Sequence, residues 1–356
     1  MLQNDNEDSF LYSGDSLDFY KIWPKANVIV SDGPYGVNGY VGDSNTPQEL
    51  PEIYEPHIKE WTKYAKPGAT LWFWNTEIGW ALVHPILEKY GWEYNGCNTW
   101  DKGIGFIAGN SNSKTLSKFP IVSEVCVQYL LKPKFKFNDE EVEEKVWLRA
   151  EWQRSGLQLY KTNEACGVKN AATRKYFTQC HLWYSPPPEQ FEKIVNYANE
   201  HGHPAGRPYF SLDGIESLTK QQWIDIHPKF YCPYGTTNVW SVPMVAGEER
   251  IRKKGSQKAA HSNQKPLKLM NLIIESSTDK GDVIWEPFGG LCSAMYAAID
   301  NERQAYGAEI NKEFYELAME RLEYLKRKKG INISQDIEDN LNDEKNDKIE
   351  QLSISL

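Results

Sequence analysis

Short apolar runs bounded by turn residues recur in the first third of the chain. Residues 27–31 (NVIVS) form a β-branched run that enters the loop DGPYG at 32–36, and residues 69–74 (ATLWFW) form a second run. Runs of this length predict buried strands. Residues 80–90 predict a helix, and the apolar run 122–131 closes the block. This alternation predicts the α/β class, in which ligands bind beyond the carboxyl ends of the strands.

The same alternation returns after residue 258. Pro266 suits the first turn of a helix. In chain order, the pattern predicts a helix at 266–277, a strand at 282–285, a helix at 294–300, a strand at 304–308 and a helix at 311–328.

Between these blocks the alternation is lost, and clustered Pro and Gly residues at 186–188 and 202–208 predict short irregular pieces. We therefore expect an inserted domain. The predicted division is 1–132 for the catalytic half of the core, 133–258 for the insert, 259–328 for the cofactor half, and 329–356 for an acidic tail that we expect to be disordered.

The net charge of −9 argues against a nucleic-acid partner until its distribution is considered. Residues 331–356 hold seven acidic residues against two basic ones, whereas 250–274 is basic and free of acids. A basic surface can therefore coexist with an acidic total. Thirteen Trp and twenty Tyr residues exceed what a core usually needs, so some rings are expected to serve recognition.

The six cysteines are scattered, and no apolar N-terminal run resembles a signal peptide or a membrane span. We therefore expect a reduced, cytoplasmic protein without a membrane partner. His201, His203 and His227 lack the carboxylate or cysteine spacing of a metal site, so no metal is expected.

Two loops at predicted strand ends carry candidate chemistry. At 286–290 the turn EPFGG would let a ligand approach the backbone, and Glu309, about twenty residues on, would bind ribose hydroxyls. The incomplete glycine pattern favours an adenosine-type ligand over a dinucleotide, and a turn without ligand is the alternative. At 32–35 a carboxylate, a loop carbonyl and an aromatic ring could hold a planar amine, although an ordinary turn explains the same residues.

Taken together, these motifs resemble the amino-group DNA methyltransferases. DGPYG resembles their DPPY catalytic motif, and NQKP at 263–266 followed by WEPFGG at 285–290 resembles their cofactor half. GDSL at 14–17, WDK at 100–102 and SEV at 123–125 resemble further core motifs. Because the catalytic motif precedes the cofactor motif, the order resembles the permuted β class.

The resemblance implies a Rossmann-like S-adenosylmethionine-dependent fold with circularly permuted motif order and an inserted target-recognition domain. It implies methyl transfer to the exocyclic amino group of a flipped base in double-stranded DNA, aligned by positioning and without a metal. The implied catalytic residues are Asp32, Gly33, Pro34 and Tyr35, with the Tyr35 ring stacked on the base. The implied cofactor residues are Asp15, Lys265, Pro266, Glu286, Pro287, Phe288, Gly289, Gly290 and Glu309.

Two departures from the family pattern affect this interpretation. Gly33 replaces the first proline of the catalytic motif, and Glu286 replaces the commoner aspartate of the cofactor turn. An acid at the first catalytic position usually accompanies adenine N6 methylation and a serine accompanies cytosine N4. Since Ser31 directly precedes Asp32, adenine is favoured and cytosine stays open.

Basic residues interleaved with aromatic ones in the insert suit phosphate contact and stacking, and a solvated basic face is the alternative. The predicted DNA-binding residues are Arg149, Arg154, Lys169, Arg174, Lys175, Arg252, Lys253 and Lys254. A cognate restriction endonuclease and a second copy of the chain are candidate partners. A catalytically silent DNA-binding module, an RNA or protein N-methyltransferase and a nicotinamide enzyme are the other classes considered.

Overall fold

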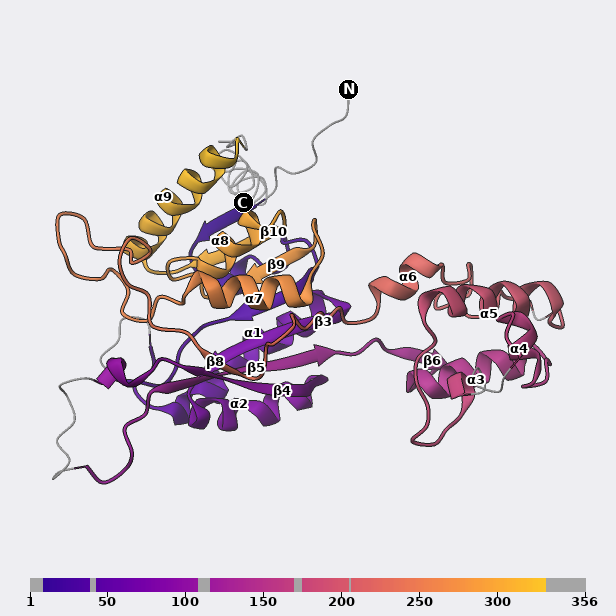
Figure 1. Ribbon diagram of the computed structural model, residues 1–356. Helices are drawn as coiled ribbons and strands as arrows, with labels where there is room; N and C mark the ends of the chain where they lie inside the picture. Colours follow the sequence, from indigo (N-terminus) through magenta and orange to yellow (C-terminus); the bar gives the residue numbers. More distant parts are fainter. Residues whose placement is uncertain (1–8, 39–42, 108–115, 170–174, 205, 331–356) are drawn as a thin grey trace, which may run out of the picture.

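The computed structural model describes residues 9–38, 43–107, 116–169, 175–204 and 206–330, and a single large sheet forms its centre (Figure 1). In spatial order the strands are β1 (Phe10–Ser13), β10 (Gln304–Glu309), β9 (Val283–Glu286), β2 (Ala26–Ser31), β3 (Ala65–Asn75), β5 (Ser123–Leu131), β4 (Trp92–Asp101) and β8 (Val239–Ser241). Of these eight strands, only β5 runs against the others. The predicted Rossmann-like α/β class is confirmed.

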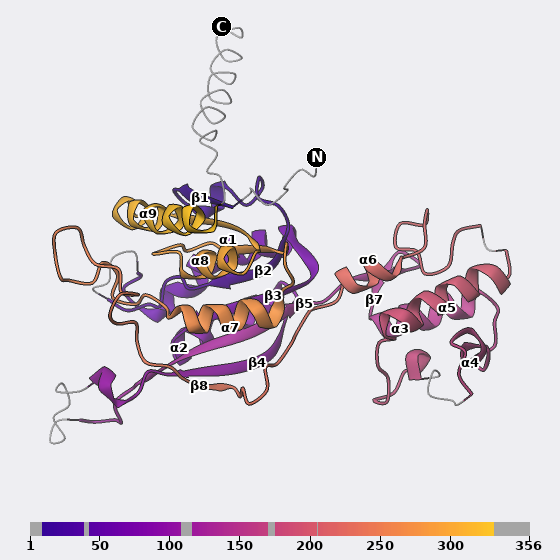
Figure 2. The same cartoon turned by 45° about the horizontal axis from the view of Figure 1, so that its top comes forward.

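Helices cover both faces of this sheet (Figure 2). Alternate residues of β2 point to opposite faces, so Val28 and Val30 pack with one set of helices and Ile29 with the other. The first set is α7 (Leu267–Ser277), α8 (Ser293–Asp300) and α9 (Lys312–Lys329); the second is α1 (Leu50–Tyr64) and α2 (Glu77–Lys89). No helix in the described ranges is long and apolar enough to cross a membrane.

The helices predicted at 266–277, 294–300 and 311–328 agree within one residue with α7, α8 and α9, whereas the helix predicted at 80–90 begins earlier, at Glu77, and α1 was not predicted. The hydroxyl of Thr76 accepts a hydrogen bond from Gly79 N at the start of α2, and Asn311 caps α9 through Phe314 N. Gly330 ends α9 with a left-handed backbone. The short 3₁₀ helices η1 (Ser16–Asp18), η2 (Pro47–Glu49) and η3 (Ile104–Ile107) lie in loops. The predicted acidic tail lies, from residue 331 on, outside the described residues.

The insert is a helical domain with its own apolar core, so the prediction of short irregular pieces is wrong. It contains α3 (Glu144–Arg154), α4 (Lys161–Ala165), α5 (Pro188–His201), α6 (Lys220–Asp225) and the hairpin of β6 (Phe135–Phe137) and β7 (Glu140–Val142). The prolines at 187–188 begin α5 instead of breaking the chain. Phe191, Ile194, Val195 and Ala198 then form its buried stripe.

The insert ends earlier in the chain than predicted. Its core draws on residues from Phe135 to Ile226, whereas β8 pairs with β4 and Trp240 packs in the core of the main sheet. Residues from 239 onward therefore belong to the main domain, and the predicted boundary at 258 is too late.

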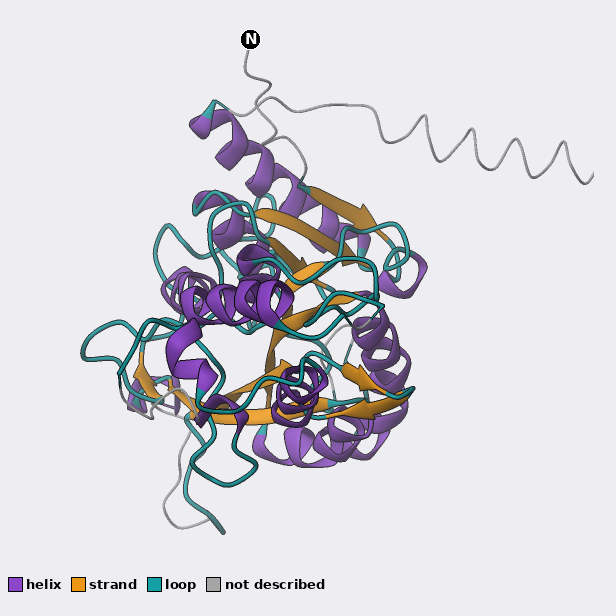
Figure 3. Ribbon diagram, turned by 90° about the vertical axis from the view of Figure 1, so that its right-hand side faces the viewer, coloured by secondary structure: helices purple, strands orange, loops and turns teal. Residues whose placement is uncertain are grey.

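The insert projects from the end of the sheet that lies to the right in Figure 1 and that faces the viewer in Figure 3. The chain enters it from Leu131, the last residue of the antiparallel strand β5, which lies at the amino ends of the parallel strands. On the way back, Lys229 forms an ion pair with Asp282, just before β9. The insert thus lies at the edge of the sheet opposite the carboxyl ends of β2 and β9.

Candidate active site

Acidic residues from both halves of the chain gather at the carboxyl edge of the sheet. Asp15, Asp32 and Glu309 follow or end the parallel strands β1, β2 and β10, and Glu286 ends β9. Glu124 lies at the same edge because β5 is antiparallel and begins there. Since β2 is hydrogen-bonded directly to β9, the predicted catalytic and cofactor motifs are neighbours.

The loop after β2 is held by side chains on both sides. The carbonyl of Pro34 accepts hydrogen bonds from the Tyr54 hydroxyl and from Asn75 Nδ2, both at 3.0 Å. Asp43 Oδ1 accepts the backbone N–H groups of Tyr35 and Gly36, at 2.8 and 2.7 Å. These bonds fix the backbone on which the predicted catalytic side chains stand.

A buried group of charges surrounds Asp32. Lys265 Nζ lies 2.6 Å from Asp32 Oδ1 and 3.3 Å from Glu124 Oε2. Lys102 pairs with the other oxygen of Glu124. The hydroxyl of Tyr35 lies 2.9 Å from Asp32 Oδ1 and 3.2 Å from Glu124 Oε2, so its single proton can be donated to one carboxylate at a time.

Mutual pairing keeps Lys265 and Glu124 ionised despite their burial. Burial would lower the pKa of Lys265, but Asp32 and Glu124 outweigh it and raise that pKa. Burial would raise the pKa of Glu124, but Lys265 and Lys102 outweigh it and lower that pKa. Burial, together with the nearby Asp32 and Glu124 carboxylates, raises the pKa of Tyr35, which therefore stays a phenol.

Ser31 and Asp32, the two candidates for the first residue of the predicted catalytic motif, differ in exposure. Ser31 is the last residue of β2 and its side chain is fully buried in the sheet, whereas the Asp32 side chain is 20% exposed. Asp32 is therefore the group that a substrate can reach. Tyr35 differs from the expected open ring, because its hydroxyl bonds hold it inward and it is only 7% exposed.

Gly33 lies where a side chain has no room. A Cβ there would lie 2.6 Å from Phe288 Cδ2 and 2.7 Å from the Tyr54 hydroxyl. Phe288, from the cofactor turn, packs against Tyr54 and His57 with centroid separations of 5.6 and 4.8 Å. The glycine that departs from the family pattern is thus required by the contact between the two motifs.

On the cofactor side, Glu309 and Asp15 stand at neighbouring strand ends. Gly14 N donates to the Glu309 carbonyl because β1 pairs with β10. The Glu309 carboxylate accepts Gly290 N and Asn311 N, both at 2.6 Å, and burial raises its pKa. Its remaining lone pairs could accept ribose hydroxyls. Gly289 lies close to Ala308, where a Cβ would meet the carbonyl at 3.0 Å.

Four predicted cofactor residues have other neighbours. Glu286 is buried, and its two oxygens accept Ala294 N and Met295 N at the start of α8. Lys265 lies at Asp32, as described above, and Pro266 is the N-cap of α7. Pro287 is buried in the turn itself. Direct contact of these residues with a cofactor stays a prediction.

The predicted DNA-binding residues fall into two separate groups. Lys253 and Lys254 are exposed and pair with Glu313 and Glu320 of α9, and Arg252 donates to the Gly247 carbonyl. These residues belong to the main domain, in the segment that leads to His261 beside Gly290.

The other group lies in the insert, at the far edge of the sheet. Arg154 pairs with the fully buried Glu151 and donates to backbone carbonyls, so it supports the core of the insert, and Arg149 donates to the Phe177 carbonyl. Lys169 and Lys175 are exposed. Arg174 lies outside the described residues.

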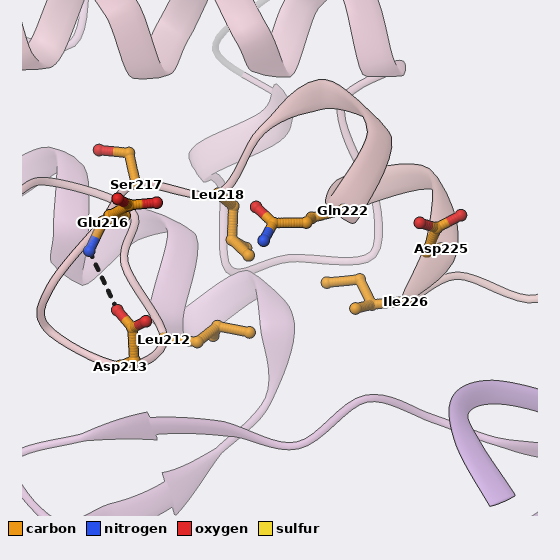
Figure 4. A pocket seen from close by; sticks show the side chains of 8 residues that line it. All are labelled: Leu212, Asp213, Glu216, Ser217, Leu218, Gln222, Asp225 and Ile226. Carbon is orange, nitrogen blue, oxygen red and sulfur yellow. Dashed lines mark hydrogen bonds between the residues drawn. The ribbon is translucent and has the colours of Figure 1, made fainter. Parts of the chain in front are cut away.

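A pocket in the insert is lined by acidic and apolar side chains rather than by basic ones (Figure 4). Its lining includes Asp213, Glu216 and Asp225, beside Leu212, Leu218 and Ile226. Asp213 Oδ1 accepts the backbone N–H of Glu216 at 3.1 Å. Carboxylates repel phosphate groups, so this pocket does not suit the backbone of a nucleic acid.

Sequence reasoning did not assign a role to Glu124, Lys102, Asp43, Asn75 or Tyr54. The motifs WDK and SEV contain Lys102 and Glu124, and the presence of both motifs could have indicated an ion pair between these two residues. Asp43, Asn75 and Tyr54 act through contacts with a loop carbonyl or loop amides, which leave no local pattern in the sequence.

Comparisons with known proteins agree with this geometry. A family model described as DNA methylase (N6_N4_Mtase) matches residues 26–320. The Type II methyltransferase M2.MboI of Moraxella bovis is 31% identical over 144 residues, which make up 38% of this chain and 45% of that protein. The Type II methyltransferase M.ScaI of Streptomyces caespitosus is 26% identical over 253 residues, 68% of this chain and 69% of that protein.

This chain therefore spans less than half the length of the Moraxella bovis relative. Among solved structures, the crystal structure of an M1.HpyAVI–SAM complex matches with a TM-score of 0.48 and 15% identity, covering 88% of this chain and 98% of that chain.

Proposed function

We propose that this chain, which belongs to the N6_N4 family of DNA methylases, transfers a methyl group from S-adenosylmethionine to the exocyclic amino group of a flipped base in double-stranded DNA. The observation that carries this proposal is the contact between the two motifs. Asp32 and the turn at 286–290 follow neighbouring strands, and Gly33 packs against Phe288.

The residues around the turn fit S-adenosylmethionine by their chemistry. Glu309 and Asp15 offer carboxylate oxygens at adjacent strand ends, which suit ribose hydroxyls and an amino group. Gly289 and Gly290 leave the backbone open to close approach, and Phe288 offers a ring. The bound cofactor would supply an activated methyl group, and the protein residues would hold it beside Asp32.

The catalytic loop would act by orienting the target amine. The amine is a weak nucleophile because its lone pair is delocalised into the base. Asp32 and the Gly33 carbonyl accept its two N–H bonds and so favour a pyramidal nitrogen whose lone pair is directed at the methyl group. Stacking of the base on Tyr35 requires that ring to become more exposed than it is here. Because Ser31 is buried and Asp32 is accessible, we favour adenine N6 over cytosine N4.

We assign the duplex to the carboxyl edge, with Arg252, Lys253 and Lys254 as phosphate contacts. The exposed ion pairs of Lys253 and Lys254 with α9 are weak enough to be exchanged for phosphates. Reading of the target sequence by the insert stays a prediction, and its place at the far edge of the sheet weighs against it. A cognate endonuclease is a candidate partner, since the relatives are named Type II methyltransferases.

The direct test is a transfer assay with labelled S-adenosylmethionine and mixed duplex DNA, followed by nucleoside analysis. We expect N6-methyladenine. Asp32→Ala should abolish transfer while the cofactor affinity, measured by calorimetry, stays nearly intact; Glu309→Ala should weaken that affinity. Formation of 5-methylcytosine, or full activity of Asp32→Ala, would contradict the proposal.

A further inference from the structure

The two oxygens of the Asp32 carboxylate have different surroundings. Oδ1 accepts hydrogen bonds from Lys265 Nζ at 2.6 Å and from the Tyr35 hydroxyl at 2.9 Å. Among the described residues, no hydrogen bond to Oδ2 is found. The side chain of Asp32 is 20% exposed. Oδ1 is therefore occupied by protein donors, whereas Oδ2 is available to a substrate donor.

Lys265 cannot move easily from this position. It is 1% exposed and also donates to the Tyr35 hydroxyl at 3.0 Å. Its ammonium lies 5.1 Å from the Tyr35 ring centroid and 5.3 Å from that of Trp74, so aromatic faces surround the cation. An ammonium held by carboxylates and rings in a dry site is a fixed charge rather than a mobile one.

Charge balance explains why the cluster holds two lysines. Asp32 and Glu124 carry two negative charges, and Lys265 and Lys102 carry two positive ones. Lys265 lies between the two carboxylates and separates them. Without it, Asp32 would face Glu124 with no cation of its own.

From this geometry we propose that Lys265 is a positioning residue: it fixes Oδ1 of Asp32 and presents Oδ2 to the target amine. The inference rests on the proposed methyl transfer and deepens it. It replaces the role in cofactor binding that the sequence suggested for Lys265. Glu124 and Lys102 complete the arrangement, because Glu124 holds Lys265 from the other side and Lys102 neutralises Glu124.

The test is the Lys265→Met variant, which keeps the length of the side chain without its charge. We expect kcat to fall about 100-fold, as for a misplaced catalytic group. The affinity for S-adenosylmethionine, measured by calorimetry without DNA, should change less than about threefold.

Two further variants test whether the kinetic defect arises only because the protein fails to fold. Lys229→Met removes a half-buried lysine from Asp282 at the opposite edge, and it should leave kcat unchanged. Lys265→Met combined with Glu124→Gln removes one charge of each sign, so the cluster stays balanced while Asp32 still lacks its cation. This double variant should fold and keep the kinetic defect.

The outcomes separate the two proposals. A wild-type protein that transfers no methyl group refutes the proposed function itself. If the wild type is active but Lys265→Met keeps its kcat and loses cofactor affinity more than tenfold, Lys265 binds the cofactor and the positioning role is wrong. Wild-type kcat in the charge-balanced variant would also overturn it.

Discussion

The absence of a side chain at Gly33 allows the catalytic loop to pack against Phe288 of the cofactor turn. Gly33→Ala would place a methyl group 2.6 Å from the Phe288 ring and 2.7 Å from the Tyr54 hydroxyl. Either the catalytic loop or the cofactor turn must then shift. We expect the free energy of unfolding to fall by about 1–3 kcal/mol and kcat to fall about 100-fold, as measured by denaturant titration and transfer assays.

Gly96→Ala in β4 is the matched control, since a Cβ there meets no atom within 4 Å. It should leave both quantities close to the wild type. Equal behaviour of the two variants would mean that the packing of Phe288 on the catalytic loop does not constrain activity.

At this scale the sequence predicted the positions of the candidate site residues better than their contacts. Asp32, Glu309 and Asp15 stand at the strand ends that the motifs indicated. The contact of Lys265 with Asp32 joins residues 233 positions apart, and no local pattern encodes it. Contacts of this kind depend on which strands become neighbours, which a single sequence does not state.

At the scale of an element, the junction between β9 and α8 carries an unusual carboxyl group. Burial raises the pKa of Glu286 to about 8, although the amides of Ala294 and Met295 offset part of the shift. The folded protein therefore keeps a proton that the unfolded chain, with an ordinary value of 4.5, releases. The stability from this group is fully present below about pH 4.5 and is lost as the pH rises to about 8.

Glu286→Gln should remove this dependence because an amide does not titrate. Thermal denaturation across this range should show a shallower loss of stability for the variant, by up to about 1.4 kcal/mol per pH unit. Glu192→Gln, the same change on the exposed face of α5, should follow the wild-type curve. Parallel curves for all three proteins would show that Glu286 is ionised in the folded state.

The strands β2, β3, β5, β9 and β10 and the helices α2, α7, α8 and α9 were predictable because each is an apolar run ended by a turn residue or a cap, whereas α1, β1, β4 and β8 were not predicted. The insert was not, for a reason visible in α5. Prolines at 187–188 suggested a break, but a proline at a first helical turn starts a helix, and the apolar spacing from Phe191 to Ala198 was the stronger signal.

At the scale of the whole molecule, the direction of β5 decides where the insert lies. The chain leaves that strand at the edge opposite Asp32, which hydrophobic runs alone could not reveal because they carry no strand direction. The position of the insert therefore bears on how DNA is held.

Alanine at both Lys253 and Lys254 should weaken binding to all duplexes alike. It should also reduce the slope of the logarithm of the binding constant against the logarithm of salt concentration by about two. Alanine at both Lys169 and Lys175 in the insert should have a smaller effect. Filter binding at several salt concentrations, with duplexes of different sequence, measures both. If the insert variant instead loses more affinity than the Lys253 and Lys254 variant, and loses it only for some duplex sequences, the insert recognises the target sequence.

Only two stretches of chain tie the insert to the sheet, one after Leu131 and one between Ile226 and β8. Its core is separate, and neither stretch passes through the carboxyl edge. In evolutionary terms this segment is free to vary: it can be lengthened, shortened or exchanged between lineages while the geometry around Asp32 is preserved. Descendants of one ancestral enzyme could thus acquire different partners while sharing a single reaction.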